Sequence, residues 1–185
     1  MSKGILRLAL LFCALLLMEP SAGVMAQQET SYEYKVKAAY ICNFARFVEW
    51  PSEPSGTSGE PLIIGILGNN PFGEDLEATI KDKKIRGRKI VIRQISEFRQ
   101  LYSCHILFVG QSEDICLSEL LQKLKGRSIL TIGETKKFSD AGGMIRFVLQ
   151  QNKVRFEINP KAAKEAGLKV SSQLLKLAVI VSPGK

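Results

Sequence analysis

Hydrophobic residues recur at every second position in two runs near the end of the chain, which predicts a β-hairpin. The first run places Ile145, Phe147 and Leu149 on one face, and the second places Val154, Phe156 and Ile158 on one face. Gln150, Gln151 and Asn152 form the connection, and Asn tolerates the left-handed backbone of a tight turn. We expect Phe156 to point into the core and Arg155 to point outward. An antiparallel core hairpin accounts for every residue from 142 to 159, so function must be sought elsewhere.

Before the hairpin, apolar runs typical of buried strands alternate with helical patterns. The predicted strands are Leu62–Leu67, Ile90–Ile95, Ile106–Val109 and Ser128–Ile132. The predicted helices are Tyr32–Trp50, a helix beginning at Pro71, a short helix over Glu97–Tyr102, a helix bearing Leu117, Leu120, Leu121 and Leu124, and a helix over Asn159–Ala166. Lys81–Lys89 is predicted to be a basic turn, and Glu134–Asp140 a loop or short helix.

A last helix is expected after Ser171 or Ser172, which would cap it. Its predicted apolar stripe is Val170, Leu174, Leu177, Ala178 and Val181. Strands that alternate with helices predict a mostly parallel central sheet with right-handed crossovers and helices on both faces. The expected fold class is therefore α/β, in a single three-layer domain whose antiparallel C-terminal hairpin lies at one edge of the sheet.

The first predicted helix, over residues 32–50, is amphipathic. Its apolar face contains Val36, Ala39, Tyr40, Phe44, Phe47 and Val48. Lys35, Arg46 and Glu49 lie on the opposite face, near Cys42, and are the candidate partner-binding residues, because exposed charge guides encounter between proteins. The alternative is that they form a passive solvated surface. Proline after Trp50 is expected to end the helix, and Ser52–Glu60 is expected to be an exposed linker that lets it shift.

The start of the chain predicts export. Lys3 and Arg7 precede an apolar run over residues 8–18, which is too short to span a bilayer comfortably. Small or modest residues from Val24 to Ala26 suit a signal peptidase. We therefore expect a signal peptide over residues 1–26, cleaved after Ala26, and an exported domain over residues 27–185. The alternative is an uncleaved membrane anchor.

The formal charge of +8 becomes +7 without residues 1–26. Nucleic acid is not an expected partner, because an exported protein rarely meets it. Anionic lipid head groups or an acidic protein suit a basic exported domain better. The basic residues are nevertheless scattered along the sequence, so an ordinary solvated surface is the alternative.

Residues with catalytic or ligand-binding chemistry are sparse. The three cysteines outside the signal peptide are an odd number, so one at least is unpaired. Cys104 and Cys116 should lie at opposite ends of a strand, about 17 Å apart, whereas bridged Cα atoms lie within about 7 Å. His105 opens an apolar strand and is expected to be a packed residue. We expect no metal site, no catalytic group and no enzyme activity.

The segment Gly68, Asn69 and Asn70 is the candidate ligand loop. It follows a strand and precedes a helix, where backbone N–H groups could hold an anion. The glycines nearby lack the spacing of a dinucleotide or phosphate loop, so no cofactor is predicted. A G-x-S-x-G nucleophile elbow is absent as well.

Several segments, in order, resemble the YfiR-like family of periplasmic proteins. They are KAAYICNFARFVEWP, LGNNPFG, IRGRKIVIR, CHILFVG, SILTIGE, GGMIRFVLQQNKVRFEIN and SSQLLKLA. The resemblance covers nearly the whole exported chain, from Tyr34 to Val181. Each segment alone is weakly specific, and their shared order and spacing carry the resemblance.

The resemblance implies a periplasmic regulator that is not an enzyme and forms dimers. It would bind the periplasmic domain of an inner-membrane diguanylate cyclase and hold that cyclase inactive, which controls cyclic di-GMP and biofilm formation. The alternative function is a small-molecule-binding sensor domain that acts on another partner, such as a sensor kinase. The family's disulfide switch is not carried over, because this chain has Ile64 or Gly65 where the family has a strand cysteine, so Cys104 loses its partner.

Overall fold

The computed structural model describes residues 22–51, 59–113 and 116–182. The chain divides into two compact units, residues 1–32 and residues 33–185, and the second contains the sheet. The predicted signal peptide lies mostly outside the described residues, and its cleavage after Ala26 stays a prediction. Most of the predicted Ser52–Glu60 linker also lies outside them. Within the described residues, no helix is both long and apolar enough to cross a membrane.

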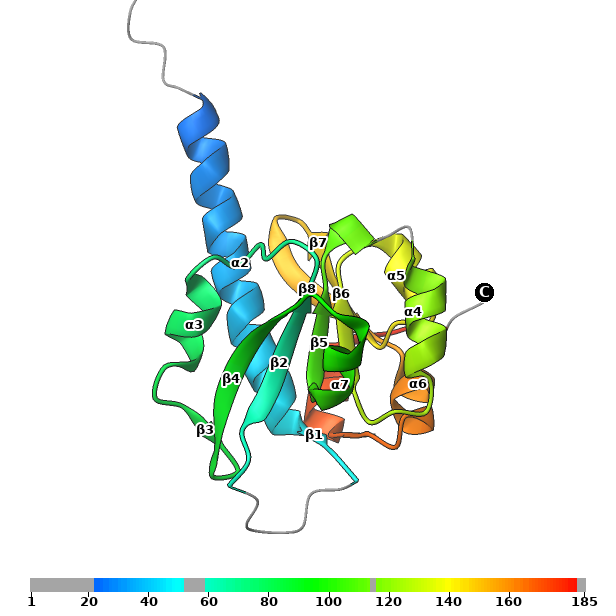
Figure 1. The fold of residues 1–185 in the computed structure, drawn as a ribbon. Helices are drawn as coiled ribbons and strands as arrows, with labels where there is room; N and C mark the ends of the chain where they lie inside the picture. The colour runs from blue at the N-terminus through cyan, green and yellow to red at the C-terminus, as the bar shows by residue number, and fades with distance from the viewer. Residues whose placement is uncertain (1–21, 52–58, 114–115, 183–185) are drawn as a thin grey trace, which may run out of the picture. The chain divides into compact units, whose positions relative to one another are not determined.

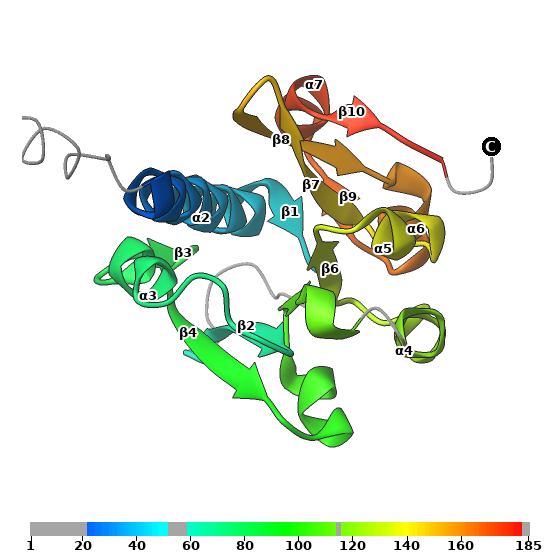
Figure 2. The same ribbon diagram turned by 90° about the horizontal axis from the view of Figure 1, so that it is seen from above.

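A curled sheet forms the centre of the second unit (Figures 1 and 2). Its eight described strands follow the order β10-β8-β7-β6-β5-β2-β4-β3. The bounds are β2 (Leu62–Leu67), β3 (Lys84–Ile85), β4 (Arg88–Ile95), β5 (Ile106–Val109), β6 (Leu130–Gly133), β7 (Ile145–Gln150), β8 (Lys153–Ile158) and β10 (Val179–Ile180). Pairing is parallel from β4 to β7 and between β8 and β10, and antiparallel for β7–β8 and β3–β4.

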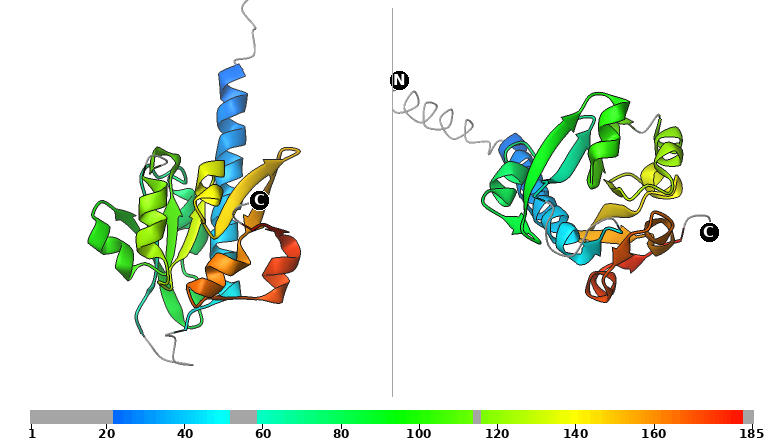
Figure 3. Two further views of the ribbon diagram at one scale, coloured as in Figure 1. Left: turned by 90° about the vertical axis from the view of Figure 1, so that its right-hand side faces the viewer. Right: turned by 60° about the horizontal axis from the view of Figure 1, so that its bottom comes forward.

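Helices cover both faces of the sheet, so the predicted three-layer α/β fold is confirmed. One face packs against α2 (Ala22–Phe47), α3 (Asp75–Ile80), α6 (Pro160–Glu165) and α7 (Ser172–Leu177). The other packs against η1 (Phe98–Ser103), α4 (Leu117–Leu124) and α5 (Lys136–Asp140), and a short turn, η2 (Gln111–Glu113), follows β5. Two further short strands, β1 (Val48–Glu49) and β9 (Lys169–Val170), pair with each other outside the main sheet. Figure 3 shows the part of α2 from Glu33 to Phe47 within the curl of the sheet.

The β7–β8 hairpin is confirmed in type and register. Phe147 lies opposite Phe156, and both side chains are buried, while Arg155 is exposed. The two-residue turn places Gln151 and Asn152 at φ values of 50° and 59°. This left-handed pair matches the right-handed twist of the flanking strands.

The predicted end of the first helix is wrong. The helix ends at Phe47, because Val48 and Glu49 leave it to form β1 and pair with β9. The predicted apolar face is also shifted. Ala39 is exposed, whereas Ala38, Ile41 and Ala45 are fully buried. The curl of the sheet surrounds the helix, so the buried stripe is set by the surrounding strands rather than by the largest side chains.

Two further boundaries differ from the prediction because short strands form where turns or helix were expected. The predicted basic turn contains β3, which folds back on β4 through Arg86 and Gly87, both at positive φ. The predicted last helix stops at Leu177, which is 67% exposed, because the next residues form β10 beside β8. Strand β10, rather than the hairpin, is therefore the edge of the sheet.

Smaller boundary differences affect two other helices. The helix expected from Pro71 begins at Asp75, after a turn. The short helix expected over residues 97–102 is a 3-10 helix, η1.

Candidate functional site

The outer surface of α2 carries two of the three predicted partner-binding residues. Lys35 and Arg46 are both exposed and lie about three helical turns apart on one side of the helix. The ammonium group of Lys35 lies 3.9 Å from the carboxylate of Asp75. Glu49 is also exposed, but it belongs to β1 and pairs with Lys169. The structure therefore brings Lys35 and Arg46 onto one surface and places Glu49 beyond the end of the helix.

The β3–β4 hairpin extends this charged surface. Arg46 and Lys83 line a 110 Å³ hollow with Cys42 and Ile85. Beside it, an open 730 Å³ cleft against α3 gathers charges of both signs. They are Lys81, Lys83, Lys84, Lys89, Glu74, Glu77 and Asp82. The surface is thus charged throughout, with lysines on the hairpin and carboxylates mainly on α3.

The candidate ligand loop lies where the strand order of the sheet reverses. Strand β2 has β4 on one side and β5 on the other, so the loops after β2 and β5 meet there. Ligands bind at this kind of switch point in open α/β sheets. The loop that begins at Gly68 therefore occupies a position suited to binding.

Neighbouring residues already use several polar groups of this loop. Asn69 donates its backbone N–H to the Ser112 hydroxyl at 3.3 Å, and the side-chain oxygen of Asn70 accepts from the Phe72 N–H at 3.0 Å. Gly68 has φ +81°, and a Cβ there would collide with Ser112 and Glu113. The loop is shaped by close packing against η2, and ligand binding by it stays a prediction.

A buried ionic cluster joins α2 to the carboxyl end of β6. The side chain of Lys37 is 5% exposed, and its ammonium group pairs with Glu33 and Glu134. It also lies 4.3 Å from the centroid of the Tyr34 ring. The Tyr34 hydroxyl donates to Glu134 at 3.2 Å. Burial, reinforced by the Glu134 carboxylate, raises the pKa of the Tyr34 phenol.

Sequence reasoning missed this cluster. The signal was present, because Lys37 precedes Ile41, Phe44 and Val48 at helical spacing and so belongs to the buried stripe. Its partner Glu134 could not be found in this way, because it is 97 positions away. The cluster holds the α2 surface in a fixed place relative to the sheet.

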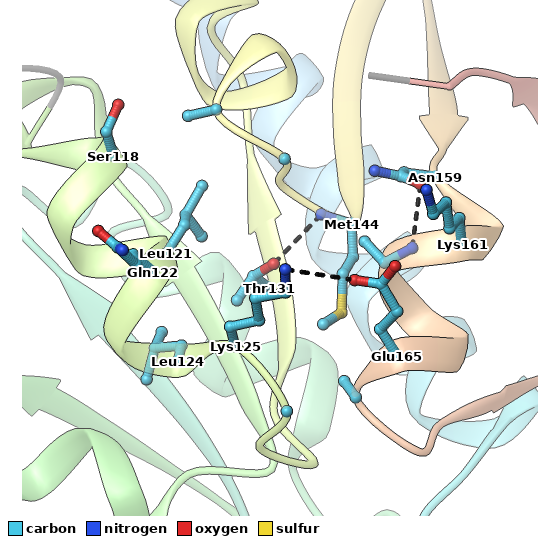
Figure 4. A pocket seen from close by; sticks show the side chains of 15 residues that line it. Ser118, Leu121, Gln122, Leu124, Lys125, Thr131, Met144, Asn159, Lys161 and Glu165 are labelled. Carbon is cyan, nitrogen blue, oxygen red and sulfur yellow. Dashed lines mark hydrogen bonds and ion pairs between the residues drawn. The ribbon is translucent and has the colours of Figure 1, made fainter. Parts of the chain in front are cut away.

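A pocket of about 470 Å³ lies between α4 and α6, with β6 and the residue before β7 at its base (Figure 4). Thr131 of β6 accepts the backbone N–H of Met144 at 3.2 Å. Asn159, the N-cap of α6, accepts the N–H of Ala162 at 3.1 Å. Sequence analysis placed Asn159 only at the start of a predicted helix and did not anticipate the pocket.

The cysteines lie in different environments, and all three are free thiols. Burial raises the pKa of Cys104 to about 11 and also raises the pKa of Cys42, whereas Cys116 is exposed at the start of α4. A Cβ added at Gly65 would lie 2.5 Å from the Cys104 sulfur. Gly65 rather than Ile64 therefore lies beside Cys104, since Ile64 packs in the core on the other face.

His105 is half-buried and packed against its neighbours, as its position in the sequence indicated. Its Nδ1 accepts the backbone N–H of Ile63 at 3.1 Å, and its Nε2 lies 2.7 Å from the Arg88 guanidinium. The Trp50 ring lies 6.1 Å away, centroid to centroid. The imidazole therefore links the start of β5 to β2 and β4.

Two solved structures align with this chain, and the first of them is similar to it in fold. A conserved domain protein from Vibrio cholerae O1 biovar El Tor strain N16961 aligns with a TM-score of 0.50 and 11% identity over 80% of this chain and 59% of that one. The ABC domain in complex with L-Trp from Streptococcus pneumoniae aligns with a TM-score of 0.48 and 13% identity over 65% of this chain and 55% of that one. The chain thus matches little more than half the length of either protein.

The family comparison covers most of the chain. Residues 34–179 match the family model described as YfiR/HmsC-like. The matched range extends from the start of the buried ionic cluster on α2 to the edge strand β10, so it includes the complete sheet apart from the last residue of β10. The chain therefore belongs to the YfiR/HmsC-like family, whose members are periplasmic regulators of cyclic di-GMP signalling rather than enzymes.

Proposed function

We propose that this protein binds the periplasmic domain of an inner-membrane diguanylate cyclase and holds that enzyme inactive. The observation that carries the proposal is the charged surface of α2, where Lys35 and Arg46 are exposed on one side beside the lysines of the β3–β4 hairpin. Family membership supplies the signalling pathway. The surface supplies a place for a partner that presents acidic side chains.

We expect the outer surface of α2 to be preorganised for binding. The Lys37 cluster fixes α2 against the sheet, so its outer side chains are presented without a costly rearrangement. Exposed lysine and arginine raise the rate of encounter with an acidic surface, and salt screens the effect over about 8 Å at physiological ionic strength. Binding through this surface should therefore weaken as salt is added.

The direct test is genetic. Deleting the gene should raise cellular cyclic di-GMP, because the cyclase is released. The double variant Lys35→Glu/Arg46→Glu should reproduce the rise while the protein stays folded. The matched control is Lys153→Glu/Arg155→Glu, which makes the same charge change at exposed positions on the hairpin and should leave cyclic di-GMP unchanged. Unchanged cyclic di-GMP after deletion, with the cyclase expressed, would contradict the proposal.

The alternative function is a sensor domain that binds a small molecule and acts on another partner, such as a sensor kinase. The pocket between α4 and α6 favours this second reading, because about 470 Å³ is a usual size for a small-ligand site. A deletion that changes output from a kinase and leaves cyclic di-GMP unchanged would support it. For either function we expect a homodimer, which light scattering of the purified protein would detect.

A further inference from the structure

Two deeply buried polar side chains at the pocket between α4 and α6, here called the α4–α6 pocket, have donors without acceptors. Asn159 is 2% exposed, and its oxygen is occupied by the Ala162 N–H. Its side-chain NH₂ has no acceptor among the described residues. Thr131 is also 2% exposed, and its oxygen accepts from Met144 while its own proton has no acceptor among them. Among the described residues, the fully buried side-chain polar atom without a partner is Trp50 Nε1. The unpaired NH₂ of Asn159 is therefore open to the pocket, where an acceptor can reach it.

The two donors lie close in the fold. Thr131 holds the N–H of Met144, and the backbone N–H of Asn159 donates to the carbonyl of Met144 at 2.8 Å. Both residues therefore flank the same residue at the base of the pocket. Both side chains line the pocket, so a ligand at its base can face both donors.

The charges that line the pocket favour an anion. Lys125, Lys161 and Glu165 are the charged side chains of the lining, so the balance is one positive charge. Lys125 and Glu165 lie 4.0 Å apart, and Figure 4 shows this pair reaching across the pocket from the α4 side to α6. Lys161 is exposed and remains available to an incoming negative group.

The apolar part of the lining is aliphatic. It consists of Leu121, Leu124, Met144, Ala141, Ala162 and Ala166. None of the described residues that line the pocket has an aromatic ring for stacking. An alkyl chain suits these walls, because burial of aliphatic surface needs no fixed geometry.

We propose that the α4–α6 pocket binds a small aliphatic carboxylate. The carboxylate accepts hydrogen bonds from the Asn159 amide and the Thr131 hydroxyl, Lys161 balances its charge, and the alkyl chain packs against Leu121 and Leu124. The proposal goes beyond the proposed function and does not depend on it, because binding is measured on the isolated protein without any cyclase.

The test is an NMR titration of the purified protein with three probes. Hexanoate should bind saturably, with a Kd of about 1 mM for a ligand of this size. It should shift the amide signals of Thr131, Met144 and Asn159. Hexanamide keeps the chain and lacks the charge, and acetate keeps the charge and lacks most of the chain. Each should bind at least about tenfold more weakly.

The Asn159→Asp variant isolates the amide donor. Asp caps a helix as well as Asn does, so the bond to the Ala162 N–H is kept, while the NH₂ is replaced by a second acceptor that repels the ligand. Hexanoate affinity should fall at least about tenfold. Ser171→Asp makes a similar change at the N-cap of α7, away from the pocket, and should leave affinity unchanged. Lys161→Gln, at an exposed position, should weaken hexanoate about threefold and leave the fold intact.

Four results would overturn the proposal. The first is a lack of saturation by hexanoate, which is expected if water alone fills the pocket, and the second is equal binding of hexanamide. The third is wild-type affinity for hexanoate in both the Asn159→Asp and Lys161→Gln variants. The fourth is a set of signal shifts confined to other parts of the protein.

Discussion

The two faces of the sheet are filled in different ways. On the α2 face, five fully buried phenylalanines form edge and stacked contacts, with Phe44 and Phe156 centroids 5.0 Å apart and Phe72 and Phe108 centroids 4.8 Å apart. On the α4 face, the core that the described residues form is mainly aliphatic, and Phe138 is the one buried phenylalanine among them. The first face is an aromatic core closed by an ionic cluster, and the second is a thinner aliphatic layer.

The difference follows from the length of the covering helices. The part of α2 from Glu33 to Phe47 lies along the curl of the sheet, whereas α4 has 8 residues and α5 has 5. Short helices leave gaps between them. One gap is a 200 Å³ hollow lined by Leu67, Phe98, Leu101 and Leu120 among others, and α4 also lines the α4–α6 pocket together with α6, which packs on the α2 side of the sheet. The α2 face is therefore suited to holding a surface rigid, and the α4 face to admitting a ligand.

The largest expected effect is on the aromatic core. Phe156→Ala should lower the free energy of unfolding by about 3–5 kcal/mol, because it opens a cavity among packed rings. Arg155→Ala, one residue away on the exposed face, should change it by less than about 1 kcal/mol. Chemical denaturation measures both. A larger loss for Arg155→Ala would mean that the hairpin register is inverted.

Removing the buried ammonium group of Lys37 should have the second-largest effect on the free energy of unfolding. Lys37→Ala should cost about 3 kcal/mol, because it leaves the Glu134 carboxylate buried without its cation. Lys37→Met fills the same space without the charge and separates the loss of volume from the loss of charge. Urea denaturation of the two variants should give a larger loss for alanine. Equal stability of Lys37→Ala and wild type would show that the cluster does not hold α2 in place.

A smaller effect is expected from overpacking the α4 face. Gly65→Ala should destabilise the protein by about 1–3 kcal/mol, because the new methyl group meets the Cys104 sulfur and Ile95. Adding Cys104→Ala should restore part of that loss. Denaturation of the two single variants and the double variant gives the double-mutant cycle. If the two changes in the free energy of unfolding simply added, the contact between position 65 and Cys104 would be contradicted.

The smallest perturbation is chemical labelling of the thiols. At pH 8 iodoacetamide should modify Cys116 first, because it is exposed, and Cys104 far more slowly, because its raised pKa keeps the thiol protonated. The labelling rate of Cys104 should increase until the pH reaches about 11. Since the folded pKa is raised, the stability that the protonated thiol contributes is present below pH 9 and is lost as the pH rises through about 11. Peptide mass spectrometry follows the labelling and also tests whether Cys104 and Cys116 are bridged.

Local sequence patterns determined much of the fold. Period-two alternation located β7 and β8, and the expected cap of the last helix, Ser171 or Ser172, is Ser171, which accepts the Leu174 N–H. The leucines of α4 are buried as their spacing indicated. These features depend on residues a few positions apart, which is the range over which periodicity and capping operate.

Tertiary structure decided where segments distant in sequence meet. Val48 belongs to β1 rather than to α2, because it pairs with β9. Val179 belongs to β10 rather than to the last helix, because it pairs with β8. Lys37 pairs with Glu134, which is 97 positions away in the sequence. The polar base of the α4–α6 pocket depends on the order of β6, β7 and β8 in the sheet. A one-dimensional pattern shows which side of an element is buried. It does not show which other element covers that side, because this depends on the pairing of strands and the curl of the whole sheet.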